Sequence, residues 1–362
     1  MAIVRILVGA LGTVLALGTL GSAVRTVVVP RGEQTFVARI TVIPMRRLFH
    51  FVASHRRDAV KADSTLARFG PSALMMFPFV WATGVVLGCA CILWALGVEP
   101  FRAAFILSGS SLTTMGFRTT TDLPTLVVSI IEGIVGLGLV ALLISFLPTI
   151  YGAFSKRELA VAKLHLRATG PDGVASPTSL LMRRHMIDSI GEMAPMWTEW
   201  EDWFVEVEES HTSFPILVFF RSPVPDRSWI ASAGMALDSA ALYLSVLDVP
   251  REPRAQLMIR TGTLSLRRVC DFFGFEYDAE PAPTDPISIT RAEFDAAMDE
   301  FAAAGMSLVA DRDQAWRDYS GWRVNYDRPL LSLASFVDAP PIPWSTDRAF
   351  KVDRPRLFAR RS

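Results

Sequence analysis

Apolar residues in the first half of the chain gather into long runs that polar segments separate. The runs extend from Ile3 to Val24, from Pro71 to Val98 and from Leu123 to Tyr151, and the first contains a single charged residue, Arg5. Each run has the roughly 20 residues that a helix needs to cross a bilayer. The pattern therefore predicts three membrane-spanning helices, the first within residues 1–24.

A secretory signal peptide is the alternative for the first run. Arg5 would be its charged n-region and Gly21-Ser22-Ala23 its cleavage site. The run is longer than the apolar region of most signal peptides. A retained helix is therefore favoured, and cleavage stays open.

Two shorter features lie between the second and third runs. Phe101 to Leu112 is apolar but too short to span a membrane, and a polar loop that contains glycine follows it. Irregular backbone at membrane depth is tolerated only where it is buried in protein or lines water. The pattern is typical of a re-entrant loop, and an ordinary turn between two helices is the alternative.

The loop resembles the selectivity filter of potassium channels, whose signature is T-T-V-G-Y-G-D. Residues 101–117 read FRAAFILSGSSLTTMGF, which is similar to a pore helix followed by that filter. The resemblance covers roughly residues 71–155. It implies a pore unit over residues 71–154 and an ion-binding filter formed by Thr113, Thr114, Met115, Gly116 and Phe117.

The sequence departs from this family after Phe117. Arg118 replaces the second Gly of the signature, and Asp122 and Pro124 come later than the Asp and Pro of the channels. Filters of the Trk/Ktr potassium transporters, which also lack the second Gly, are similar too. Those proteins resemble four pore repeats in one chain, whereas this chain has one. The resemblance therefore implies a homotetramer with potassium as the permeant ion.

The residue types of the loop suit cation binding. An ion leaves water only when oxygens replace its hydration shell, and backbone carbonyls from four loops can form such a ring. Thr114 adds a hydroxyl, and Gly116 permits the positive φ that points successive carbonyls in one direction. At the pore mouth Arg118 would repel cations, unless Asp122 neutralises it.

The third run carries four inner-helix candidates: Glu132, Gly133, Gly136 and Gly138. A carboxylate in a membrane helix is rare and functional by default. We therefore expect Glu132 to face either protein behind the filter or the cavity, not lipid, and to hydrogen-bond one of three serines: Ser108, Ser110 or Ser111. The glycines allow either close helix packing or a gating hinge.

Charge predicts the orientation of the spans. Residues 25–70 carry nine basic and three acidic side chains, which marks a cytoplasmic loop. Apolar residues interleave with its arginines, so the loop either lies on the inner leaflet as an amphipathic segment or packs against the ends of the spans. Lys156, Arg157 and Lys163 follow the third span and place the C-terminal domain in the cytoplasm. A multi-pass protein of the cell's inner membrane is expected.

The rest of the chain is expected to be a helical cytoplasmic domain over residues 155–275, followed by an acidic linker, a helix and an extended tail over residues 276–362. Helical spacing predicts helices at residues 178–190, 193–210, 226–247, 253–273 and 290–304. Residues 229–247 are apolar enough to suggest a fourth span, but Asp238 favours a buried helix. The tryptophans of residues 197–203 are expected in the core, and the acidic residues 199–209 on a solvated face.

Other chemistry has little support. The five histidines are scattered, and Cys89, Cys91 and Cys270 show neither a disulfide framework nor zinc spacing. A formal net charge of zero provides no field for nucleic acid. We expect no enzyme, no cofactor and no metal beyond the filter cation, and the ligand of the cytoplasmic domain stays open.

The sequence thus predicts an all-α membrane protein with a tetrameric pore-loop channel core and an extra N-terminal transmembrane helix. A non-conducting membrane receptor or assembly platform on the same scaffold is the alternative.

Overall fold

The computed structural model describes residues 1–27, 36–56, 58–224 and 227–348. Over these residues the chain is helical, with two isolated β-bridges and no strand. The predicted all-α class is confirmed. The helices are α1 (Ala2–Val27), α2 (Phe36–Ser54), α3 (Ala59–Ala67), α4 (Phe69–Ala95), α5 (Phe101–Leu112), α6 (Leu123–Ala168), α7 (Pro177–Met186), η1 (Ile190–Glu192), α8 (Ala194–Ser213), η2 (Pro215–Phe219), α9 (Trp229–Val246), α10 (Pro253–Phe273), α11 (Arg291–Ala303) and α12 (Arg312–Phe336).

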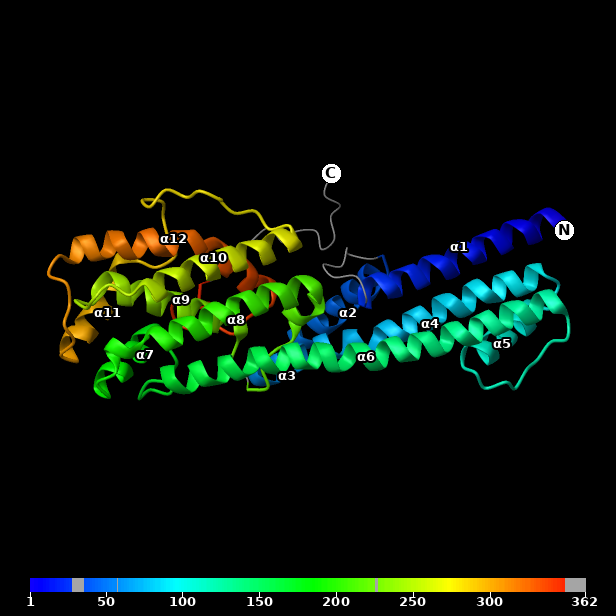
Figure 1. Cartoon of the computed structure of the whole chain (residues 1–362), viewed down its shortest axis with the longest axis horizontal. Coiled ribbons are helices and arrows are strands. Elements are labelled where there is room, and N and C mark those ends of the chain that lie inside the picture. Colours follow the sequence, from blue (N-terminus) through cyan, green and yellow to red (C-terminus); the bar gives the residue numbers. More distant parts are fainter. Residues whose placement is uncertain (28–35, 57, 225–226, 349–362) are drawn as a thin grey trace. The chain divides into compact units, whose positions relative to one another are not determined.

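The chain divides into two compact units, residues 1–152 and residues 153–362, and the division falls inside α6. In the first unit α1 and α4 lie side by side along their lengths, with α5 at one end of α4 (Figure 1). The end of the predicted tail, residues 349–362, and residues 28–35 of the basic loop lie outside the described residues.

Four helical segments are long and apolar enough to span a membrane: α1, residues 61–95, α6 and α9. Only 11% of the apolar window of α6 is buried inside the structure, whereas 94% of that of α9 is buried. A helix that protein surrounds on all sides has no face for lipid, so the prediction of a buried helix over residues 229–247 is confirmed. The candidate spans that keep a face for lipid are therefore α1, α4 and α6.

Small residues let α1 and α4 approach closely. A Cβ added to Gly12 would lie 2.5 Å from the carbonyl oxygen of Gly88, and one added to Gly84 would lie 2.6 Å from the hydroxyl of Thr19. Interfaces of this kind are typical of membrane helices, because small side chains bring the two backbones into van der Waals contact. The first apolar run thus forms an integral part of the helix packing of the first unit.

Apolar contacts fix α5 against α4. Leu93 of α4 packs with Ala104 and Leu107 of α5, and Leu112 at the end of α5 packs with Val85 of α4. α5 has 12 residues, about 18 Å at 1.5 Å per residue, which is shorter than the roughly 30 Å hydrocarbon core. The pore-helix candidate therefore ends in its loop without crossing a bilayer.

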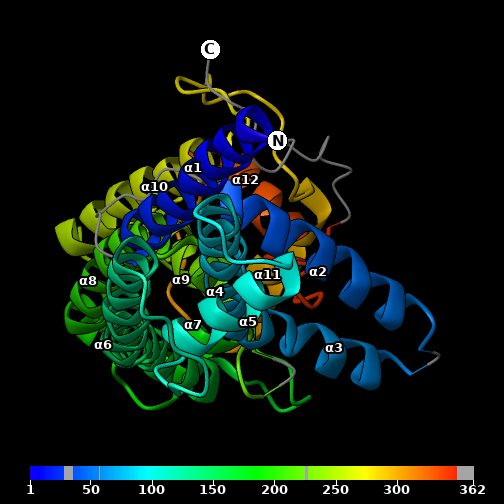
Figure 2. The same ribbon diagram turned by 90° about the vertical axis from the view of Figure 1, so that its right-hand side faces the viewer.

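The basic loop forms two helices beside α4, which Figure 2 shows. α2 buries Val37, Val42 and Ala53 and contacts the start of α4. Packing against the spans, one of the two interpretations of this loop, is therefore present. The face of α2 opposite Val42 and Ala53 is exposed from Ile40 onward.

In the second unit, α8 joins its neighbours through both apolar and ionic contacts. Trp197, Trp200 and Phe204 are buried, which confirms the predicted aromatic core. The acidic face is not simply solvated, because ion pairs connect it to α6 and α10: Lys156–Glu206 at 2.6 Å, Lys163–Glu199 at 2.7 Å and Arg268–Glu208 at 2.5 Å.

α12 corrects the prediction for residues 276–362, which contain two helices where one was expected. Its buried face carries Arg323, which donates to Asp238 of α9 at 2.5 Å and to Asp327 at 2.7 Å. Tyr326 also donates to Asp238, at 2.8 Å. Because charged side chains occupy this core face, the apolar periodicity that marks a helix is broken. The charges are tolerated there because they are paired and hydrogen-bonded.

Candidate functional site

α5 leads directly into the candidate filter. Thr113 caps the helix, and its N–H donates to the carbonyl of Gly109 at 3.1 Å. The side chains that follow are exposed in the single chain, with Met115 at 74% and Phe117 at 63%. One copy of the chain therefore leaves this loop open.

Two loop residues have left-handed backbone conformations. Gly116 has a φ of 69°, and the predicted positive φ is confirmed. Thr114 has a φ of 56°, which strains an L-residue by about 1–2 kcal/mol. The N–H of Thr114 donates to Ser111 O at 3.0 Å, and its hydroxyl donates to Thr113 O at 2.7 Å. Strained residues cluster at functional sites, although Asp188, Asp338 and Trp344 of the second unit also have positive φ.

Ser110 ties the end of the loop back to α5. Its hydroxyl accepts a hydrogen bond from the N–H of Arg118 at 3.0 Å and donates to the carbonyl of Arg118 at 3.2 Å. The N–H of Gly116 donates to the carbonyl of Ser110 at 3.4 Å. Ser110 is 1% exposed, so a buried side chain sets the path of the loop.

Arg118 and Asp122 form no ion pair with each other in the described part of the chain. The Asp122 carboxylate instead accepts from the hydroxyl of Thr125 at 3.3 Å, and Arg118 is exposed. Arg118 also stays outside the left-handed region that a second Gly would occupy in the channel signature. Asp122 therefore does not neutralise Arg118 in one chain.

Glu132 lies behind α5 and faces protein, as predicted. It is 1% exposed and accepts a hydrogen bond from Ser108, whose hydroxyl also lies 3.0 Å from the carbonyl of Val86. A hydroxyl has one hydrogen, so Ser108 can donate to only one of these two oxygens at a time. The contact connects α4, α5 and α6 behind the loop.

The three glycines of α6 have different surroundings. A Cβ on Gly136 would lie 1.9 Å from the carbonyl oxygen of Leu112, one on Gly133 would lie 3.5 Å from that of Ser111, and one on Gly138 would meet nothing within 4 Å. α6 is helical through all three. Packing is therefore the role of Gly136, and the hinge stays a prediction.

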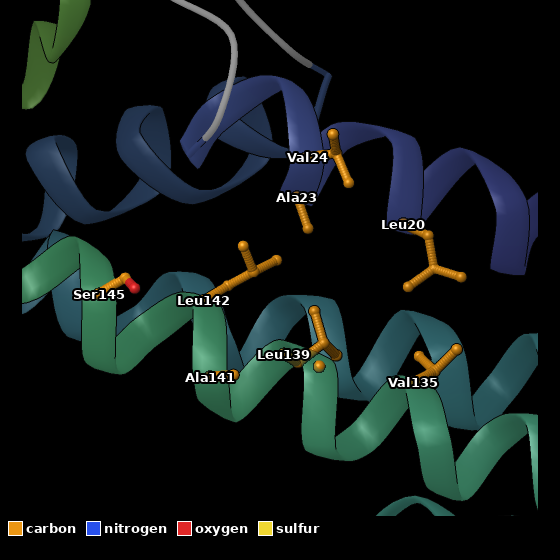
Figure 3. A pocket seen from close by; sticks show the side chains of 9 residues that line it. Leu20, Ala23, Val24, Val135, Leu139, Ala141, Leu142 and Ser145 are labelled. Atoms are coloured by element: carbon orange, nitrogen blue, oxygen red, sulfur yellow. The ribbon is translucent and has the colours of Figure 1, made fainter.

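An apolar groove of about 440 Å³ separates α1 from α6 (Figure 3). Leu20 of α1 and Leu142 of α6 point into it from opposite sides (Figure 3). Its lining is formed by Leu20, Ala23, Val24, Val135, Gly138, Leu139, Ala141, Leu142 and Ser145. With one hydroxyl among apolar side chains, the groove cannot replace the hydration shell of an ion.

Arg157 anchors the C-terminal part of α6 in the second unit. It is 3% exposed and donates to the carbonyls of Leu217 at 3.0 Å and Phe220 at 2.6 Å. It also donates to Nε2 of His211 at 3.0 Å, which leaves Nδ1 of His211 to donate to the carbonyl of Val207 at 2.9 Å. Burial, and next the charge of Arg157, lowers the pKa of His211 well below its usual value. His211 is therefore a neutral acceptor.

Sequence reasoning did not identify the roles of Ser110 and Arg157. The partners of both are mainly backbone groups, eight residues away for Ser110 and 60 or more for Arg157, which no residue pattern records. A signal existed for Arg157, because it precedes the buried Val161 by four residues and so shares its helix face.

The described residues contain no group of three or more His, Cys, Asp or Glu side chains that could hold a metal ion.

Comparison with protein-family models, with curated proteins and with solved structures finds no match to this chain. The residues of the α5–α6 loop and their contacts therefore carry the functional argument.

Proposed function

We propose that the chain is one subunit of a homotetrameric cation channel in the cell's inner membrane. Potassium is the permeant ion, and the backbone oxygens of residues 113–117 form the filter. The observation that carries this proposal is the pair of left-handed residues, Thr114 and Gly116, in a loop that α5 holds between two spans.

The conformation of the loop suits carbonyl coordination. In an extended strand, successive carbonyls point to opposite sides. Left-handed residues alter this alternation, and at Gly116 they do so at no steric cost. Four symmetric copies would then surround an axis with oxygens, which is how carbonyl filters replace the hydration shell of potassium.

The exposure of the loop and of α6 supports assembly from several copies. Polar backbone at membrane depth must meet protein or water, and in one chain the loop is uncovered, with Met115 and Phe117 at 74% and 63% exposed. α6 likewise leaves most of its apolar window uncovered. Four copies around an axis would cover the loop and place one face of each α6 along a water-filled pore.

The second unit is proposed to be a cytoplasmic regulatory or assembly domain. Arg157 and the ion pairs of Lys156 and Lys163 hold residues 153–168 of α6 within it. A change in this unit would therefore displace the continuation of the pore-lining helix.

Ion flux through purified protein in liposomes tests the proposal. Protein is first fractionated by mass in detergent, and the tetramer fraction is reconstituted. We expect potassium flux that exceeds sodium flux. A monomer or dimer as the main species, or tetramers without flux at any voltage, pH or calcium concentration, would instead favour the non-conducting platform.

A further inference from the structure

An apolar stripe runs along the exposed face of α2. Ile40, Leu48 and Phe51 are 46%, 58% and 64% exposed, and Pro44 lies between them on the same face. Positions 40, 44, 48 and 51 follow helical spacing. Three large apolar side chains on one helical face are more than the scattered exposure that soluble surfaces show.

Basic side chains accompany this stripe. Arg47 is exposed within the stripe. Arg39 is exposed on the same helix, and Arg56 is exposed shortly after the helix ends. Residues 36–56 contain four arginines and no acidic residue. An apolar face bordered by arginines favours a surface that is apolar inside and anionic outside, because each part of the helix then meets its complement.

The position of α2 in the chain brings it to the membrane surface. Residues 28–35 separate it from the end of the α1 span, and α3 follows it, with only Arg68 between the end of α3 and the start of α4 at Phe69. On the opposite face of α2, Val42 and Ala53 are buried, and the helix contacts both α3 and α4. The helix therefore cannot turn its apolar stripe inward.

We propose that α2 lies in the interface of the leaflet and binds anionic phospholipid, with Leu48 and Phe51 among the acyl chains and Arg39, Arg47 and Arg56 at the lipid phosphates. This inference requires only that the chain is a membrane protein, and it holds whether or not the loop conducts ions. It makes α2 a lipid-binding element that packs against the α4 span and is connected to it through α3.

Spin labels measure what covers the stripe. Cys89, Cys91 and Cys270 are replaced by alanine, and single cysteines are placed at Leu48 or Phe51 of the full-length protein. The labelled protein is reconstituted in vesicles of phosphatidylethanolamine and phosphatidylglycerol. Collision with oxygen reports lipid, and collision with a water-soluble nickel chelate reports solvent. Leu11 of α1, which is 67% exposed, provides the lipid reference, and Leu264 of α10, at 44%, the aqueous one.

The proposal predicts that labels at Leu48 and Phe51 collide with oxygen as often as the label at Leu11 and several-fold less with nickel than the label at Leu264. Replacing the three arginines by glutamine should reduce the oxygen collisions in anionic vesicles to the level seen in purely zwitterionic ones. Nickel-dominated collisions would overturn the proposal in favour of an aqueous surface. Low collision rates with both reagents would overturn it in favour of a protein cover, such as a second copy.

Discussion

The hydroxyl of Ser108 on α5 hydrogen-bonds the carboxyl of Glu132 on α6. The two residues are 24 positions apart and belong to the short helix and the long helix on either side of the loop. Their contact braces the base of the candidate filter, because α5 carries the filter at its end.

Glu132→Gln is expected to leave the tetramer intact, since the amide oxygen can still accept a hydrogen bond from Ser108. Glu132→Ala removes this partner and leaves a small void, which costs about 1–3 kcal/mol. Thermal unfolding of tetramers in detergent measures the difference, and potassium flux should fall more in the alanine variant. Equal stability of the two variants would contradict the bracing role of Glu132.

Gly136→Ala should destabilise the membrane unit, because its Cβ would lie 1.9 Å from the carbonyl of Leu112. Overpacking of this kind costs about 1–3 kcal/mol. Gly138→Ala is the matched control: it meets nothing within 4 Å and gains up to about 1 kcal/mol of helix propensity. Unfolding in detergent compares them. Similar stabilities would mean that α5 does not end against Gly136.

Arg118→Gln should raise inward cation current, and Asp122→Asn should lower it. The two side chains form no ion pair in one chain, so each acts on the mouth separately. A unit charge about 7 Å from a cation contributes roughly 0.6 kcal/mol in water, before screening. Because salt screens this term, both effects should grow at low ionic strength. Currents that do not respond to either substitution or to salt would show that these charges do not act on the ion.

Because of His211, we expect the free energy of unfolding to decrease in mild acid. The pKa of His211 in the fold is lowered well below 6.5, so the unfolded chain binds the extra proton first as the pH falls. The free energy of unfolding should therefore decrease below pH 6.5, by at most about 1.4 kcal/mol per pH unit. His211→Gln retains an acceptor for Arg157 and should flatten this dependence. An unperturbed histidine titrates between about pH 7.5 and 5.5. If the wild type and His211→Gln show the same pH dependence of unfolding over that range, the neutral His211–Arg157 contact is contradicted.

The sequence was informative where the signal was local. Long apolar runs predicted α1, α4 and α6, and the helix over residues 253–273 was predicted at its observed bounds. The glycine at position 116 predicted a positive φ there. The left-handed conformation of Thr114 was not predicted, because a β-branched residue rarely adopts a positive φ. α12 was missed because Arg323 and Asp327, which pair with each other, interrupt the apolar pattern on its buried face. In these cases the decisive contact joins residues that only the folded chain brings together.

Potassium flux through reconstituted Gly116→Ala tetramers tests the central claim most directly. A Cβ at this left-handed position strains the backbone that orients the carbonyls. Gly173→Ala is the matched control, since Gly173 has a φ of 79° with nothing within 4 Å but lies in a turn of the second unit. The account predicts tetramers of both variants, flux at the wild-type level for Gly173→Ala, and flux abolished for Gly116→Ala. Wild-type flux in the Gly116→Ala variant would contradict it and place any pore elsewhere.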